Sequence, residues 1–372
     1  MGSLCPPKKN RTLVNSVWLI SLTAMHSKFI LLLGLGFGLA RSLWANEKKS
    51  LELRWENDSF LDPFGEEFTD RHYTQGFFLR YWNGDDSDES GFLWSSQAMR
   101  SVWNLGMEVE ATRGGIAFGQ EIYTPEDIAF GPSFFGVGYS LDAFDVQVDD
   151  RPYAGYLFVE PQWERRGTVS FFAVEEVPVR DRFGIALGVV GPASGAEEVQ
   201  TRWHDLFNGV EPVGWEQQLE NEFAFTLHAE RTWLLQYRGK QSALAVDLMP
   251  TVGFDLGNVS TRLTVGSEVR VGFGDVHAFA LPSMGDVVCG NGFYLFASAE
   301  GWAVGRNIFL DGNTFRDSHS VDKERWVGEV SFGFGFRTPV LEGQVGWVGR
   351  SKEFEIQDES NSYLSLSAKI LF

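Results

Sequence analysis

Most of the chain after residue 45 alternates between apolar and polar side chains in short segments. The clearest are residues 73–82, 114–123, 155–163, 169–177, 183–191, 223–237, 263–274, 329–338 and 362–372. Such alternation predicts β-strands whose two faces meet different surroundings. With weaker candidates included there are about twelve strands, each near the ten residues that a tilted membrane-spanning strand needs. The pattern therefore predicts an all-β fold, an integral outer-membrane antiparallel barrel.

The last segment supports this interpretation. Counted back by twos from Phe372, one face is apolar and the other polar; the first carries Ile370, Ala368, Leu366 and Leu364, and the second Lys369, Ser367 and Ser365. An apolar row suits lipid and a polar row suits a barrel lumen. The alternative is a soluble β-sandwich whose last strand happens to end on phenylalanine.

Residues 1–45 have the pattern of an N-terminal extension and signal peptide. An apolar core, residues 28–40, follows a basic residue and precedes a run of small residues. We expect cleavage after Ala45, or after Ala40, and the true start could be Met25. The alternative is a signal anchor that holds a soluble enzyme on the inner membrane. No apolar run of about 18 residues follows, so residues 46–372 are assigned to the barrel.

Composition narrows the class of partner. Aromatic residues make up 15% of the chain beside 41 glycines, which is typical of a glycine-punctuated β-barrel with aromatic girdles. The net charge of −19 argues against a nucleic-acid partner, because phosphate binding needs a basic surface. Acidic clusters could instead bind divalent cations. After signal cleavage Cys289 is the only cysteine, which excludes an internal disulfide.

Residues 192–209 depart from the alternation and predict a short helix. Ser194 and Glu197 have capping-box spacing, and Asn208-Gly209 is a usual helix stop. The apolar side chains within it fall on one stripe at helical spacing, namely Val199, Trp203, Leu206 and Phe207. In a barrel, such a helix belongs to a long extracellular loop or to a plug.

Gln200 and His204 are four residues apart and would share one face of this helix. A histidine beside a polar partner that fixes its tautomer is a candidate general base. The alternative is a histidine with a structural role only. Weaker candidates are His72, His228, His277 and His319, of which His228 is expected to face the lumen. The chain contains no His-Glu-x-x-His zinc motif and no Gly-x-Ser-x-Gly motif.

Polar clusters follow several of the expected strands. They lie at residues 56–60, 69–76, 119–128, 149–156 and 209–222. Such clusters often only terminate strands. Here their asparagine, aspartate, glutamate and threonine oxygens are also the ligands that a hard cation such as calcium takes.

In this order, the clusters resemble the outer-membrane lipid A deacylases, which remove 3'-linked acyl groups from lipopolysaccharide. The motifs are Glu-Asn-Asp at 56–58, TDRxYTxG at 69–76, GQxIYTPxDI at 119–128, DRPYAGYL at 150–157, GxxGPxSxGxxxQxxxH at 188–204 with alanine at 196, and GWxxQLxNE at 214–222. Each motif is weak alone. Six in the family's order, over nearly all of the mature chain, are specific.

The resemblance implies a twelve-stranded barrel and calcium-dependent ester hydrolysis, with the active site at the outer face between the wall and a loop helix. By motif, His204 is the general base, and Gln200 orients or contacts the substrate. Asn57 and Thr74 are polar residues of the catalytic site. Asp58 and Glu211 belong to the metal site, with Glu216 as the alternative to Glu211.

One feature departs from the family. Some members have an active-site lysine between the second and third motifs, yet this chain has no lysine between Lys49 and Lys240. Gln120 or Arg113 could replace it, or the activity could differ. The open alternatives are an outer-membrane phospholipase and a non-catalytic, porin-like barrel. The expected partners are lipid A and the outer membrane. The oligomeric state is undecided, with a monomer as the default.

Overall fold

The computed structural model describes residues 49–58, 71–85, 98–100, 104–126, 128, 150–171, 174–207, 212–238, 244–274, 276, 279, 281 and 291–372. The strands and helices of these ranges belong to one compact unit, Glu47–Leu371. The expected signal peptide lies outside the described residues, so its cleavage site stays a prediction.

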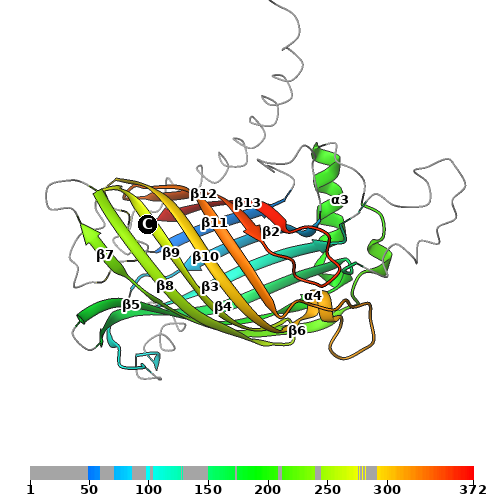
Figure 1. The fold of residues 1–372 in the computed structure, drawn as a ribbon, viewed down its shortest axis with the longest axis horizontal. Helices are drawn as coiled ribbons and strands as arrows, with labels where there is room; N and C mark the ends of the chain where they lie inside the picture. The colour runs from blue at the N-terminus through cyan, green and yellow to red at the C-terminus, as the bar shows by residue number, and fades with distance from the viewer. Residues whose placement is uncertain are drawn as a thin grey trace, which may run out of the picture. The chain divides into compact units, whose positions relative to one another are not determined.

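The strands form an antiparallel sheet that closes on itself (Figure 1). β1 (Ser50–Asn57) pairs with both β2 and β13, so the first and last strands meet. The remaining strands are β2 (His72–Trp82), β3 (Glu108–Thr124), β4 (Ala154–Phe171), β5 (Val174–Val190), β6 (Glu222–Trp233), β7 (Leu235–Arg238), β8 (Leu244–Gly257), β9 (Ser260–Gly274), β10 (Gly292–Asn307), β11 (Trp326–Arg337), β12 (Leu341–Arg350) and β13 (Asn361–Leu371).

The thirteen strands of the described residues occupy twelve positions around the barrel. β6 and β7 both pair with β8 and are separated by Leu234 alone, so together they act as one strand. The prediction of an antiparallel barrel of about twelve strands is confirmed. Below, the barrel end where β1 finishes and β2 begins is called the helix end. The opposite end, where β1 starts and β13 finishes, is called the terminus end.

The expected separate strand at 169–177 is wrong. β4 and β5 are 18 and 17 residues long, and Val169 pairs with Val177, so this segment is the hairpin that joins them. The alternation wrongly predicted one continuous strand because both arms of the hairpin contribute residues to the same apolar face. The segments 155–163 and 183–190 are parts of these two long strands, and Gly191 follows β5.

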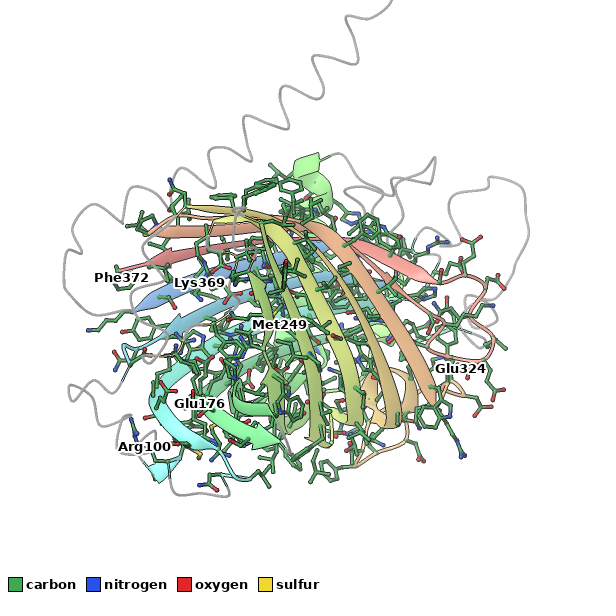
Figure 2. All side chains as sticks on the ribbon, turned by 60° about the vertical axis from the view of Figure 1, so that its left-hand side comes forward. Arg100, Glu176, Met249, Glu324, Lys369 and Phe372 are labelled. Atoms are coloured by element: carbon green, nitrogen blue, oxygen red, sulfur yellow. The ribbon has the colours of Figure 1, made fainter. Side chains whose placement is uncertain are left out.

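Side chains alternate between the lumen and the outer wall. On β1, Glu52 and Arg54 line a cavity inside the barrel. Leu51, the residue before Glu52, is on the opposite face and is 37% exposed. Figure 2 shows Arg100 and Glu176 toward one end of the strands and Glu324 at the other. The outer wall is strongly apolar, with exposed Leu79, Ile116, Phe118, Val159, Leu187, Phe254, Val265, Leu295 and Phe332. This band suits the hydrocarbon core of a membrane.

The last strand follows the expected pattern. Ser365 and Ser367 line the lumen, and Lys369 is opposite Glu52 in the register with β1. Leu366 and Ile370 are half-buried on the other face. The assignment of a polar inner row and an apolar outer row is therefore confirmed.

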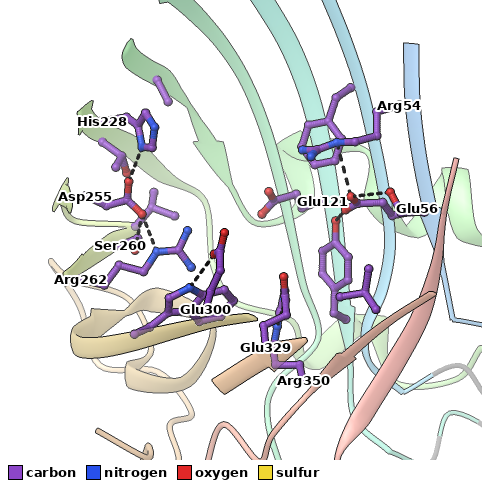
Figure 3. A pocket seen from close by; sticks show the side chains of 18 of the residues that line it. Arg54, Glu56, Glu121, His228, Asp255, Ser260, Arg262, Glu300, Glu329 and Arg350 are labelled. Atoms are coloured by element: carbon purple, nitrogen blue, oxygen red, sulfur yellow. Dashed lines mark hydrogen bonds and ion pairs between the residues drawn. The ribbon is translucent and has the colours of Figure 1, made fainter. Parts of the chain in front are cut away.

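The lumen contains a cavity of about 620 Å³ lined with charged and aromatic side chains (Figure 3). Its charges are compensated locally. His228 Nδ1 is 2.7 Å from Asp255 Oδ1, and Arg262 Nε donates to Asp255 Oδ2 at 2.7 Å. Arg350 Nε donates to Glu329 Oε2 at 2.9 Å. Such pairing allows charges to remain inside the barrel.

A short helix, α4 (Ile308–Asp311), lies at the helix end of this cavity. Its three apolar residues, Ile308, Phe309 and Leu310, are at most 4% exposed. The Phe309 ring stacks on Tyr123 with centroids 3.9 Å apart, and Phe309 and Leu310 line the cavity. The helix therefore fills part of the mouth of the barrel with apolar side chains.

The insertion between β5 and β6 contains η2 (Pro192–Ser194), α3 (Ala196–Phe207) and η3 (Trp215–Gln217). The helix forms where expected, but the capping box is wrong. Gly195 has φ of +67° and separates Ser194 from α3, and Ser194 Oγ has no hydrogen-bond partner among the described residues. No described helix is long and apolar enough to cross a membrane.

Candidate active site on the outer wall

Three polar residues gather on the outward face at the helix end. Asn57 follows Leu53 and Trp55 on one face of β1, and its side chain is 1% exposed. Asn57 Nδ2 donates to the Thr74 carbonyl oxygen at 3.3 Å, and Thr74 Oγ1 is 2.8 Å from Thr124 Oγ1. The register of β2 with β3 shifts between Tyr73 and Gln75, so Thr74 occupies an irregularity in the ladder.

Glu56 belongs to the lumen instead. Tyr73 Oη donates to Glu56 Oε2 at 2.6 Å, and Ser365 Oγ donates to Oε1 at 3.3 Å. Arg54 Nε lies 3.4 Å from Oε1. Period-two alternation puts this carboxylate and its neighbour Asn57 on opposite sides of the wall. Glu56 is therefore not part of the outer-wall site.

Asp58 lies just beyond β1 and is 2% exposed. The Arg71 backbone N–H donates to Asp58 Oδ2 at 2.7 Å, and the Asp58 N–H donates to the Thr74 carbonyl at 3.2 Å. These two bonds hold the end of β1 against the start of β2. They fix the orientation of the carboxylate next to Asn57.

The helix α3 packs against the outward face of the wall. The rings of Trp203 and Trp55 are 5.5 Å apart between centroids, and Val199 packs against a buried cluster that includes Ile122. The expected stripe is only partly correct, because Leu206 is 45% exposed. The side chain of Phe207 lies outside the described part.

Gln200 and His204 face inward from α3, with side chains 2% and 8% exposed. The Trp215 Nε1–H donates to Gln200 Oε1 at 2.8 Å. Gln200 Nε2 is buried and has no hydrogen-bond partner among the described residues. His204 follows Gln200 by one turn and comes directly after Trp203, the residue that contacts β1.

The start of α3 is held to the wall by two contacts. A side chain at Gly155 would overlap Ser194 Oγ and Ala196 Cβ, so glycine permits close approach here. Gln120 Nε2 donates to the Ser194 carbonyl oxygen at 2.8 Å. Gln120, one of the two suggested replacements for the family lysine, therefore lies beside the insertion.

Arg113, the other suggested replacement, lies elsewhere. Its Nη2 is 2.6 Å from Glu164 Oε1, and its guanidinium stacks over the Trp82 ring at 4.7 Å. It is seven residues before Gln120 along β3, which at about 3.3 Å per residue puts it more than 20 Å away. Arg113 cannot supply a charge to the outer-wall site.

The two glutamates expected as candidate metal ligands differ in position. Glu211 lies outside the described residues, so its role stays a prediction. Glu216 lies in η3 beside the buried Trp215 and has an exposed side chain.

The three other histidines of the described residues lie outside this site. His228 lines the lumen, as expected. His319 Nε2 is 2.5 Å from the Asp150 carbonyl oxygen, and His72 is 1% exposed and packs edge-on against Phe354. His277 and Cys289 lie outside the described ranges.

The oxygen donors of Asn57 and Asp58 are of a kind that suits a hard cation. Asp58 offers a carboxylate, and the carboxamide of Asn57 is oriented with Oδ1 away from the Thr74 carbonyl. Oxygen atoms of these types are the usual ligands of calcium. Within the described residues, no three His, Cys, Asp or Glu side chains converge as metal ligands.

The closed barrel with an apolar outer band defines an integral outer-membrane protein. The family described as "Outer membrane protein LpxR" matches residues 29–372. The chain belongs to this family, whose activity is lipid A 3'-O-deacylation, so it is an ester hydrolase of the outer membrane.

One solved structure shares the fold of this chain. The structure "LpxR from Salmonella typhimurium" has a TM-score of 0.63 at 20% identity and covers 87% of this chain and 100% of its own. The transport unit of the autotransporter AIDA-I from Escherichia coli has a TM-score of 0.33 at 8% identity, covering 90% and 94%. No curated protein matches the chain.

Several residues of the site were not assigned to it from the sequence, although Ser194 was expected as a helix cap. Thr124, Ser194 and Trp215 all lie inside the motifs that carry the family resemblance. Their position in those motifs was the signal that could have identified them. Their contacts could not be predicted from the sequence, because each hydrogen bond joins separate segments of the chain.

Proposed function

We propose that this protein hydrolyses the 3'-linked acyl ester of lipid A with His204 as the general base, at a site open to the cell exterior. The observation that carries the proposal is the packing of α3 on the outward face of β1 and β3, with Gln200 and His204 both buried. Acyl chains of the outer leaflet contact this same face of the barrel. A lipid ester can therefore reach the site without leaving the membrane.

The reaction needs a base, a water molecule and stabilisation of negative charge. The imidazole of His204 takes a proton from water as the water oxygen bonds to the ester carbonyl carbon. The carbon–oxygen bond to the sugar then breaks, and the same proton passes from the imidazolium to the departing sugar oxygen. The products are a free fatty acid and a sugar hydroxyl. No covalent enzyme intermediate is required.

Calcium is the cofactor in this proposal. Asp58 and Asn57 would hold the ion, with Glu211 completing the site and Thr74 beside it. When bound, calcium supplies a positive charge that stabilises the oxygen of the ester as negative charge develops. The support is the pair of oxygen donors that β1 presents at the helix end.

The orientation of the barrel in the membrane is inferred from the lengths of the connections at its two ends. In outer-membrane barrels the chain termini and short turns lie on the periplasmic side, and the long loops face outward. Here the helix end holds the connections 125–153 and 191–221, and the terminus end holds the short connections 172–173 and 338–340. The connections 83–107 and 275–291 are long exceptions at the terminus end.

His204→Ala tests the base. We expect acyl release from lipid A to fall by at least about 100-fold, since general-base catalysis contributes about 10²–10⁴-fold. Mass spectrometry of lipid A measures the release, and heat-modifiable migration shows that the barrel still folds. Deacylation at the wild-type rate would contradict the assignment.

Removal of the metal tests calcium. We expect a chelator to abolish acyl release and added calcium to restore it, because the charge on the reacting oxygen would otherwise lack a counter-charge. Activity unchanged by the chelator would remove calcium from the mechanism. A mass spectrum in which phospholipids, and not lipid A, lose acyl chains would favour the phospholipase alternative.

A further inference from the structure

The hydrogen bond from Trp215 determines which way the Gln200 carboxamide faces. An indole N–H can only donate, so the atom 2.8 Å from Trp215 Nε1 must be the carbonyl oxygen of Gln200. The amide nitrogen then points away from Trp215. The carboxamide cannot flip without leaving the indole donor unpaired.

Trp215 is itself held in place by the wall. Its ring is 4.8 Å from that of Tyr153, and Tyr153 Oη donates to the Val213 carbonyl at 3.0 Å. The Leu219 N–H donates to the Tyr153 carbonyl at 2.9 Å. Trp215 is 3% exposed. The segment that carries the indole is thus anchored on both sides of Trp215 to the residue that precedes β4.

Gln200 Nε2 is a buried donor with no partner in the described part of the chain. A buried donor without a protein partner is free to bind an acceptor that enters the site. The residue lies one helical turn before His204 on the same face. Gln200 and His204, the proposed base, are therefore neighbours on the buried face of α3.

We propose that Gln200 Nε2 donates a hydrogen bond to the carbonyl oxygen of the scissile ester, and that Trp215 is the positioning residue that holds it there. The inference rests on the proposed function. Negative charge develops on that oxygen when water adds, and a preoriented N–H stabilises it. A cation cannot bind to an amide N–H, so this orientation favours a role toward the substrate.

Gln200→Glu isolates the donor. The carboxylate still accepts from Trp215 but has no N–H to offer, so kcat should fall by about 10²–10³-fold, as when one oxyanion donor is removed. We expect KM to change by less than about threefold, because the bond forms mainly in the transition state. A kcat within about threefold of wild type would overturn the donor role.

Trp215→Phe tests the positioning. It keeps a ring but removes the donor, and we expect kcat to fall by about tenfold, the loss of one hydrogen bond. Combined with Gln200→Glu it should add little further loss, and full additivity would overturn the coupling. Trp302→Phe is the matched control, since Trp302 Nε1 donates to Glu300 Oε2 at 3.3 Å in the lumen. Its activity should equal that of wild type.

A readout independent of activity keeps this inference distinct from the proposed function. In detergent micelles, the Trp215 indole N–H should exchange slowly in wild type and faster in Gln200→Leu, which cannot accept. Equal exchange in both proteins would overturn the hydrogen bond. If wild type released no acyl group from lipid A, the proposed function and the donor role would fall together, and the exchange result would still decide the orientation of the carboxamide.

Discussion

Gly155 decides how closely the inserted helix approaches the wall. It is the second residue of β4, and Ser194 and Ala196 occupy the space that a side chain would need. No left-handed conformation is involved, so the requirement is one of space alone. The residue therefore links strand geometry to the position of α3.

Gly155→Val should displace the start of α3 and reduce acyl release by at least about tenfold, since small misplacements of catalytic groups are costly. The barrel should still fold, because the strand pairing is unaffected. Gly301→Ala on β10 is the matched control: its added Cβ would be 4.0 Å from the Val265 oxygen. Wild-type activity of Gly155→Val would show that the contact is unimportant.

At the scale of elements, a buried ion pair joins two connections at the helix end. Arg151 Nη1 donates to Glu353 Oε2 at 3.1 Å, with side chains 0% and 5% exposed. The Glu324 N–H donates to the Glu353 carbonyl at 2.8 Å. The residues before β4, before β11 and after β12 are thus tied together.

Glu353→Gln should lower the free energy of unfolding by about 3–5 kcal/mol, because Arg151 would keep a buried charge without its counter-charge. Urea unfolding in micelles measures this change. Glu359→Gln is the control, since the Arg71 and Glu359 pair leaves the glutamate 67% exposed, and exposed pairs contribute about 0–1 kcal/mol. Equal stability of the two variants would contradict the role of the buried pair.

The same pair predicts a pH dependence. Burial alone would raise the pKa of Glu353, but the guanidinium groups of Arg350 and Arg151 outweigh it and lower the pKa below its ordinary value of 4.5. A lowered folded-state pKa contributes stability that is present above the unfolded value and is lost as the pH falls through the folded one. Wild type should therefore lose stability below about pH 4.5 more steeply than Glu353→Gln.

At the scale of the whole molecule, the lumen is filled in a way that does not suit a channel. Phe309 covers Tyr123 at the helix end. Toward the terminus end, Glu164 is 1% exposed and is contacted by Arg113 at 2.6 Å and Arg182 at 2.9 Å. Aromatic and ion-paired side chains replace the open aqueous path of a porin.

We expect the purified protein to show no porin-like steps in planar bilayers, because aromatic and ion-paired side chains occupy its lumen. Single-channel recording checks this, with a known porin as the positive control. Stable large conductance would instead favour the porin-like alternative. Phe309→Ala should leave acyl release unchanged, since the proposed site lies on the opposite side of the wall.

The sequence by itself determined the barrel, the inner and outer faces of the last strand, and the position of the inserted helix. Alternation and helical spacing are local properties that each segment carries alone. Only the tertiary structure decided that Glu56 turns into the lumen beside Tyr73, while Asn57 meets Thr74 on the outer wall. It also decided that Trp215 orients Gln200. These contacts depend on strand register, on the irregularity at Thr74 and on the approach of α3 over Gly155, and such long-range geometry is not encoded in any one segment.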